Sequence, residues 1–173
     1  MRYSLIIILM FFTSVLFAQT PQKIGYVDSQ VILTQFSEAI KAQSDLDALT
    51  NLWSSQLDSM KQGYQLAIAD YQKQQATMTD DQKLTKQKEI VNMEQKMVDF
   101  QQQKFGQQKG EIYTKQEEIF DPVKKKIYAA IEQVAKGEGM QFVFDKSGDI
   151  ILLYADAGFD ITYQVLDKLK RGN

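Results

Sequence analysis

A run of apolar residues spaced seven apart limits the fold of this 173-residue chain more than any other feature. The run comprises Leu84, Val91, Val98, Phe105, Ile112 and Ile119. Such unbroken spacing indicates a long helix whose apolar side chains face a supercoiled partner helix. The residues three positions further on are polar from Gln87 to Lys115, so the seam has half the apolar contacts of a full coiled coil. We therefore expect a long and loosely packed helix here.

A second helical stretch precedes this one and is expected to pack against it. From Leu46 to Met78, apolar residues recur mostly every three or four positions, which is the period of one helical face. Thr79-Asp80-Asp81-Gln82 then reads as a capping box at the start of a helix. The chain must therefore turn around, and residues 38–119 are predicted to form an antiparallel hairpin, the arm, about 60 Å long with its tip near residues 79–81.

Glycine and proline mark where these helices are expected to bend. Gly63, Gly106 and Gly110 each cost about 1 kcal/mol against Ala in a helix interior. Asp121-Pro122 reads as an N-cap followed by proline at the first helical position, which predicts a restart or a kink. The buried face that follows starts at Val123 and includes Ile127, Ala130, Ile131 and Val134, and Gly137 and Gly139 are expected to end that helix.

Both ends of the chain read as parts of a small body. Residues 23–28 form a strand-like run, and Asp28 or Ser29 is expected to cap a helix after it. Residues 140–144 and 150–154 flank a polar turn and predict a β-hairpin, and Asp160 is expected to cap a last helix. The predicted fold class is α+β: a small β-rich trimerisation body, from residues 19–37 and 120–173, with the arm inserted between its two parts.

The body is too small to cover its own apolar residues, which predicts a homo-oligomer. Ile150–Tyr154 is apolar at every position, as in a strand covered on both faces. Chains with so small a core usually gain stability by association. The residues expected between copies are Ile24, Tyr26, Val27, Phe142, Phe144, Ile151 and Leu153.

Residues 1–18 have the features of a secretory signal peptide. Arg2 precedes an apolar stretch from Leu5 to Phe17, which as a helix would span about 20 Å of a hydrocarbon core about 30 Å thick. Ala18 is the small residue at the expected cleavage point, and an uncleaved membrane anchor is the alternative. Loss of Arg2 leaves 19 basic and 22 acidic residues, a net charge of −3. An exported chain without cysteine suits an oxidising compartment.

The residue content argues against catalysis and against nucleic-acid binding. The chain has no Cys and no His, which removes thiolate nucleophiles, the commonest general base and the commonest transition-metal ligands. It contains no Gly-x-Ser-x-Gly, Ser-x-x-Lys, phosphate-binding or dinucleotide-binding motif. Asp145–Asp149 lacks the spacing of a calcium loop. A net charge of −2 is unlike that of nucleic-acid binders. We therefore expect no enzyme activity, no cofactor, no metal and no nucleic-acid partner.

Motifs at both ends of the chain carry a resemblance to a known family. They are Lys23-Ile24-Gly25-Tyr26-Val27-Asp28, Phe120-Asp121-Pro122-Val123, Phe142-Val143-Phe144-Asp145, Leu153-Tyr154-Ala155 and Asp160-Ile161-Thr162. With them the mature chain resembles the OmpH/Skp family of periplasmic chaperones. The resemblance implies a periplasmic homotrimer whose three arms surround a cavity that holds unfolded outer-membrane proteins without ATP. Well-known members are strongly basic and contact lipopolysaccharide; here the tip begins Thr79-Asp80-Asp81, so contact with lipopolysaccharide or an anionic membrane is not carried over.

The predicted function is therefore that of an ATP-independent holdase. Sparse apolar residues within polar arms offer an unfolded client many contacts of about 1–2 kcal/mol each. The expected client contacts are Met60, Tyr64, Met93, Met97 and Phe100, since flexible methionine suits promiscuous surfaces. For Met93, Met97 and Phe100, packing between the two arm helices is an equal alternative. Trp53 and Phe105 are expected to pack between the two arm helices instead. The alternative is a structural coiled-coil scaffold or spacer of the cell envelope, although a strut needs a better-packed seam.

Overall fold

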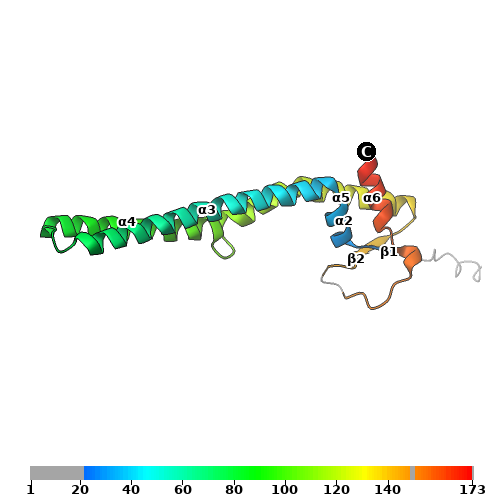
Figure 1. Ribbon diagram of the computed structural model, residues 1–173. Helices are drawn as coiled ribbons and strands as arrows, with labels where there is room; N and C mark the ends of the chain where they lie inside the picture. Colours follow the sequence, from blue (N-terminus) through cyan, green and yellow to red (C-terminus); the bar gives the residue numbers. More distant parts are fainter. Residues whose placement is uncertain (1–21, 149–150, 173) are drawn as a thin grey trace, which may run out of the picture. The chain divides into compact units, whose positions relative to one another are not determined.

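The computed structural model describes residues 22–148 and 151–172 and divides the chain into two compact units (Figure 1). Residues 33–128 form one of them, called the arm unit here. The described residues up to 32 and from 129 onward form the other, the body unit, so the arm unit is an insertion between the two parts of the body unit. The predicted signal peptide lies outside the described residues. Within those residues, none of the helices combines the length and the apolarity needed to cross a bilayer.

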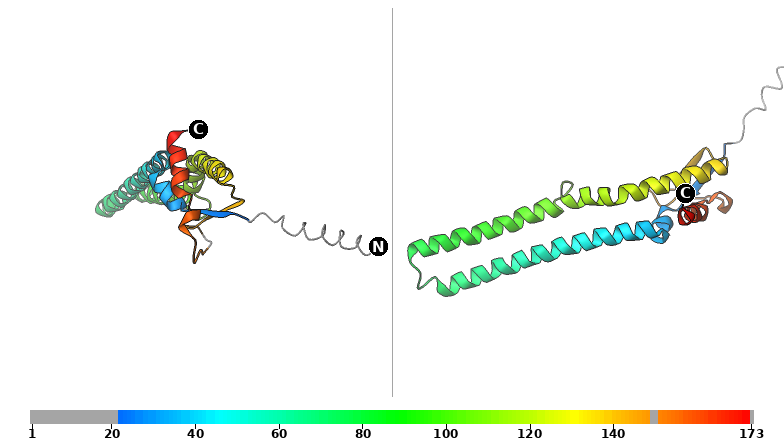
Figure 2. Two further views of the ribbon diagram at one scale, coloured as in Figure 1. Left: turned by 90° about the vertical axis from the view of Figure 1, so that its right-hand side faces the viewer. Right: turned by 90° about the horizontal axis from the view of Figure 1, so that it is seen from above.

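Two long antiparallel helices make up most of the arm unit. α3 spans Ser37–Gln74 and α4 spans Asp80–Phe105, and they lie side by side (Figure 2). The predicted capping box is confirmed: Thr79 Oγ1 accepts from the Gln82 amide at 3.3 Å, and Gln82 Oε1 accepts from the Thr79 amide at 2.9 Å. The predicted apolar face of α3 is also confirmed, because Leu46, Trp53 and Leu57 are buried.

A five-residue loop interrupts the helix that the heptad spacing predicts to be continuous. α4 ends at Phe105, residues 106–110 leave the helix, and α5 runs over Glu111–Gly137. Gly106 and Gly110 meet at the base of this loop, where the Gly110 amide donates to Gly106 O at 2.8 Å. A Cβ on Gly110 would lie 2.7 Å from Gly106 N, so the approach of the two backbones requires glycine.

This loop changes which side of the helix faces α3. Each residue of a helix advances the chain by about 100° around the helix axis, so five residues would advance it by one full turn and about 140° more. Because residues 106–110 lie outside the helix, α5 is rotated about this axis by about 140° relative to its position in a continuous helix. Three of the four predicted seam residues of α4 are exposed, by 51%, 62% and 45%: Leu84, Val91 and Val98. The half-buried residues of α4 are instead Ile90, Met93, Met97 and Phe100. The predicted seam is wrong for α4 from Leu84 to Val98, but it holds at Phe105, which packs against Trp53.

Proline does not restart the helix. Pro122 lies within α5, so the N-cap predicted at Asp121 is wrong. The Asp121 carboxylate pairs with Lys125 Nζ at 2.7 Å instead, one helical turn further on. The buried face predicted for this stretch is confirmed at Val123 and Ile127, and α5 ends at Gly137 as expected.

The body unit contains a two-stranded parallel sheet. β1 spans Ile24–Val27 and β2 spans Phe142–Asp145, with Ile24 opposite Phe142. The predicted hairpin of residues 140–144 with 150–154 is therefore wrong, since β2 pairs with β1 and residues 151–154 have no regular secondary structure. Ile150 lies outside the described residues. The described chain is thus mostly helical, and the body contains a small two-stranded sheet rather than being β-rich.

Three helical elements complete the body unit. α2 spans Ser29–Gln35, the short 3-10 helix η1 spans Ala157–Phe159, and α6 spans Thr162–Arg171. The core is formed by residues from the strand and two helices: Val27, Ile32, Ile161, Val165 and Leu166. The cap predicted for α2 is confirmed, because Asp28 Oδ1 accepts from the Val31 amide at 3.0 Å. The cap position of α6 is Ile161 rather than Asp160, although Asp160 Oδ1 accepts from the Thr162 amide at 2.9 Å.

Candidate functional surfaces

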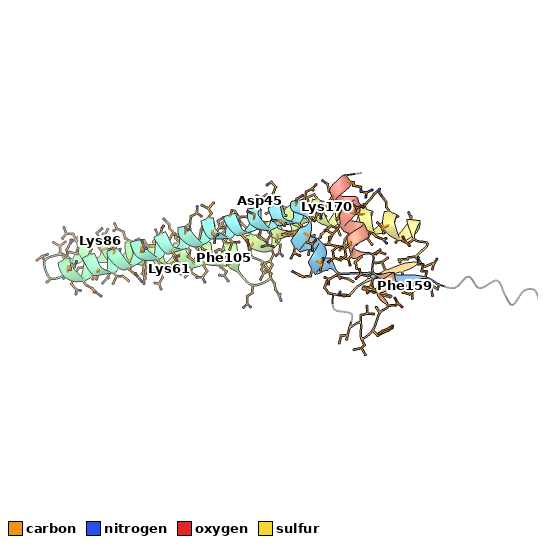
Figure 3. All side chains as sticks on the ribbon, turned by 45° about the vertical axis from the view of Figure 1, so that its right-hand side comes forward. Asp45, Lys61, Lys86, Phe105, Phe159 and Lys170 are labelled. Atoms are coloured by element: carbon orange, nitrogen blue, oxygen red, sulfur yellow. The ribbon has the colours of Figure 1, made fainter. Side chains whose placement is uncertain are left out.

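An aromatic and charged cluster fixes the base of the loop against α3. Trp53 and Phe105 meet edge to face with ring centroids 6.0 Å apart (Phe105 is labelled in Figure 3). Lys104 Nζ lies 4.9 Å from the Trp53 ring centroid and pairs with Glu111 across the loop. The hydrogen bond from Lys104 lowers the pKa of the Glu111 carboxyl. The structure therefore places Trp53 and Phe105 in packing contacts, as expected.

The five predicted client contacts are half-buried and line the facing sides of α3 and α4. Met60 and Tyr64 come from α3, and Met93, Met97 and Phe100 come from α4. They lie on these sides because α4 turns this face, and not the row of Leu84, Val91 and Val98, toward α3. Three of them border hollows in the surface. Met60 and Phe100 border one hollow, and Met93 borders another.

Three hollows follow the α3–α4 hairpin. The first has a volume of about 510 Å³ and is bordered by Leu52, Met60 and Phe100. The second, of about 460 Å³, is bordered by Leu66 and Met93 and has Gly63 among its lining residues. The third, of about 590 Å³, lies at the tip and includes Lys86, which Figure 3 labels near the end of the hairpin.

Sequence reasoning missed several residues that border these hollows. Leu52 and Leu66 are exposed by 54% and 66%, and they lie beside the main apolar row of α3 rather than in it. The signal was present, because Leu52, Ser59 and Leu66 follow one another at steps of seven. Two apolar residues and one serine are too few to be recognised as a helical face on their own.

The body unit exposes an apolar surface around its sheet. Ile24, Phe142 and Phe144 lie on one face of the sheet because side chains alternate along a strand, and all three are exposed. Ile151 and Leu153 are exposed by 84% and 93%.

Not all of the predicted interface residues belong to this surface. Val27 lies in the core of the single chain, and Tyr26 is also buried but lines the hollow that adjoins the surface. A hollow of about 300 Å³ continues the surface and adds Leu152 and Tyr154, from the apolar run that the sequence singled out, and Phe159, which it did not. Contiguous exposed apolar surface of this kind marks sites of association.

A polar network holds the turn after β2. Asp145 Oδ1 accepts hydrogen bonds from the Ser29 amide at 3.1 Å, the Ser147 amide at 3.1 Å and Ser147 Oγ at 2.9 Å. Burial acts to raise the pKa of Asp145, but the hydrogen bonds from these two serines outweigh it and the pKa is lowered. The network positions the turn. Within residues 22–148 and 151–172, no group of three or more acidic residues is arranged to hold a metal ion.

These features define a class of protein in which a long helical hairpin is inserted into a small body that leaves apolar surface uncovered. The model of the outer membrane protein (OmpH-like) family matches residues 23–169, so the chain belongs to that family. The resemblance carried by the terminal motifs is confirmed.

A solved structure shares the fold. It is an OmpH-like protein of Caulobacter crescentus CB15, assigned as an outer membrane chaperone, with a TM-score of 0.74 and 12% sequence identity. The likeness covers 89% of this chain and 87% of that chain. Among curated proteins, none matches this sequence.

Proposed function

We propose that this protein is an ATP-independent periplasmic holdase that binds unfolded outer-membrane proteins and prevents their aggregation. Membership of the OmpH-like family supports a role as a chaperone. The observation that carries the proposal is the incompletely closed α3–α4 seam, whose apolar residues are half-buried beside open hollows. A helical strut would bury these residues fully. An unfolded chain finds many weak apolar contacts there, each about 1–2 kcal/mol.

Several arms joined at one hub would convert weak contacts into long residence. The exposed body residues Ile24, Phe142, Phe144, Ile151 and Leu153 are the proposed interface of a homo-oligomer, most simply a trimer as in the family. Linked binding surfaces raise the effective concentration of the second and third contact. Release needs no nucleotide when the client gains more free energy by folding in the membrane than it loses by leaving.

The chaperone proposal is tested by diluting a urea-denatured β-barrel protein into buffer containing the full chain and no nucleotide. We expect light scattering to stay low at about one client per oligomer and to rise when the chain is omitted. Equal scattering with and without the chain would refute the proposal.

The interface is tested separately by sedimentation velocity. Replacing both Ile151 and Leu153 by Glu leaves the isolated chain almost unaffected, because these side chains are 84% and 93% exposed, but it puts charges between copies. We expect the double variant to sediment as a monomer. The control is Tyr163→Glu, also in the body unit and 68% exposed, which should leave the oligomer intact. Parent and double variant sedimenting alike would contradict the interface.

A structural scaffold is the second candidate, and one observation favours it. The exposed row of Leu84, Val91 and Val98 has the spacing that a partner helix would cover. A scaffold would capture one folded partner in fixed stoichiometry, whereas a holdase would capture many unfolded chains.

A further inference from the structure

The three hollows of the hairpin lie in one line on one side of it. Residues seven apart share a helix face, and the borders of the hollows repeat at that step on both helices. On α3 the repeating residues are Leu52, Ser59 and Leu66, and on α4 they are Phe100, Met93 and Lys86. The middle hollow and the tip hollow also share Gln74, Met78 and Lys86. The middle and tip hollows are therefore continuous, and the first hollow lies in line with them; together the three are called the groove.

Glycine accounts for the depth of this groove at its middle. Gly63 faces Met93, and a Cβ added to Gly63 would lie 3.5 Å from Met93 Cε. Larger side chains there would occupy the space that now forms the second hollow. Glycine costs about 1 kcal/mol against Ala within a helix, so the opening is obtained at the expense of helix stability.

The length of the groove matches an extended segment of chain. Leu52 and Gln74, the last residue of α3, are 22 residues apart, which corresponds to about 33 Å at 1.5 Å per residue. An extended chain covers that distance with about ten residues at 3.3 Å each. A transmembrane β-strand has about 9–11 residues.

The polar groups of the groove also favour an extended occupant over a helical one. Ser55, Gln56 and Ser59 line the first hollow, and Gln74 lines the other two. Amide and hydroxyl side chains can both donate and accept hydrogen bonds. An extended segment carries backbone N–H and C=O groups that need such partners, whereas a helix has already paired its own. Lys86 pairs with Glu89 at 2.7 Å, but Asp70 and Asp81 also line this end of the groove, so it disfavours an acidic segment.

We propose that this groove binds extended segments of about ten residues in which apolar side chains alternate with polar ones. The alternating side chains would place their apolar set on the floor formed by Met60, Gly63, Met93 and Phe100, and their polar set toward water. This proposal rests on the proposed chaperone function and assigns its client contacts to one side of each arm. The exposed row of Leu84, Val91 and Val98, on the other side of α4, is not part of the site.

Two variants on opposite sides of the hairpin test the groove. Gly63→Leu fills the middle hollow and raises helix propensity, so the hairpin stays folded. Val91→Leu enlarges an apolar side chain on the outer row and serves as the control. Binding is measured by the fluorescence anisotropy of a ten-residue peptide with strict apolar–polar alternation. We expect affinity about tenfold weaker for Gly63→Leu and unchanged within twofold for Val91→Leu. Equal affinity of both variants and the parent would overturn the groove.

A second measurement uses the absence of cysteine from the chain. Single cysteines at Ser59 and at Val91 are coupled to a photoreactive maleimide and irradiated in the presence of a denatured β-barrel protein. We expect crosslinks from position 59 and few from position 91. Equal yields would refute the groove while leaving the chaperone function in place, whereas failure of the parent chain to bind the denatured protein at all would refute the function itself. A second peptide has the same composition, but its apolar residues recur every three or four positions, as on a helix face. Tighter binding of this peptide than of the alternating one would refute the extended occupant.

Discussion

Replacing Gly106 and Gly110 by Ala should remove the loop between α4 and α5 and rotate one helix against the other. A Cβ on Gly106 would collide with Gln102 O, and a Cβ on Gly110 would lie 2.7 Å from Gly106 N. Both obstacles are backbone atoms, so the loop cannot adapt by moving a side chain. Each alanine also favours a helix by about 1 kcal/mol over glycine, which together is about 2 kcal/mol toward a continuous helix.

Winding residues 106–110 into the helix reverses the phase shift of about 140°. If α5 keeps its packing, the row of Leu84, Val91 and Val98 then turns toward α3, and the row of Met93 and Met97 turns outward. Because the chain has no cysteine, this rotation can be read from single cysteines at positions 91 and 97.

The assay is the rate of thiol labelling of these two cysteines in the parent and in the double-alanine chain. In the parent, Val91→Cys should react faster than Met97→Cys, because Val91 is 62% exposed and Met97 is half-buried. In the double-alanine chain we expect the order to reverse. Tryptophan fluorescence should change with it, because the only Trp, Trp53, packs on Phe105 at the loop. An unchanged order of labelling would refute the argument that the loop sets the helix phase.

Three further predictions concern stability. The pKa of Asp145 is lowered in the folded chain, so its contribution to stability is present above the unfolded pKa, about 3.9, and is lost as pH falls through the folded pKa. The free energy of unfolding of the body, measured by chemical denaturation, should therefore fall below about pH 4. Asp145→Asn should flatten that pH dependence. Trp53→Ala should lower the free energy of unfolding of the arm by about 3–5 kcal/mol, because Trp53 is buried against Phe105. Amide hydrogen exchange in α3 and α4 should become faster. Unchanged protection of these amides would contradict the packing role of Trp53. Thr79→Ala should cost about 1 kcal/mol in urea unfolding through loss of the cap, whereas Thr79→Ser should cost much less.

Local signals in the sequence predicted local structure well. The capping box at Thr79 and the cap at Asp28 were both identified, because each depends on hydrogen bonds within three residues. The apolar face of α3 was identified because nothing interrupts its period over 38 residues. The motifs at the two ends of the chain were sufficient to recognise the family.

Errors arose where one feature of the chain depended on a distant one. The apolar residues do recur at steps of seven, but Gly106 and Gly110 close a loop within the row. The loop rotates the residues after it about the helix axis relative to those before it, and spacing alone does not show whether a helix is interrupted. Residues 140–154 read as a hairpin because two apolar runs flank a polar turn. In the structure β2 pairs in parallel with β1, more than a hundred positions earlier, and such pairing has no signal in neighbouring residues.

The candidate site was predicted in part for a similar reason. Met60, Met93 and Phe100 were found because they are apolar residues on helices that were themselves predicted. Gly63 and Leu66 were missed because a hollow is formed by two helices together, and the register between α3 and α4 cannot be predicted from the sequence of either helix alone.

The most direct test of the chaperone account compares one client in two states. A β-barrel outer-membrane protein is labelled with a fluorophore, and its binding to the full chain is measured once after dilution from urea and once after folding into detergent micelles, without nucleotide. We expect the unfolded form to bind at least a hundredfold more tightly than the folded form, because only the unfolded form offers extended apolar segments. Equal binding of both forms, or binding of the folded form alone, would contradict the account.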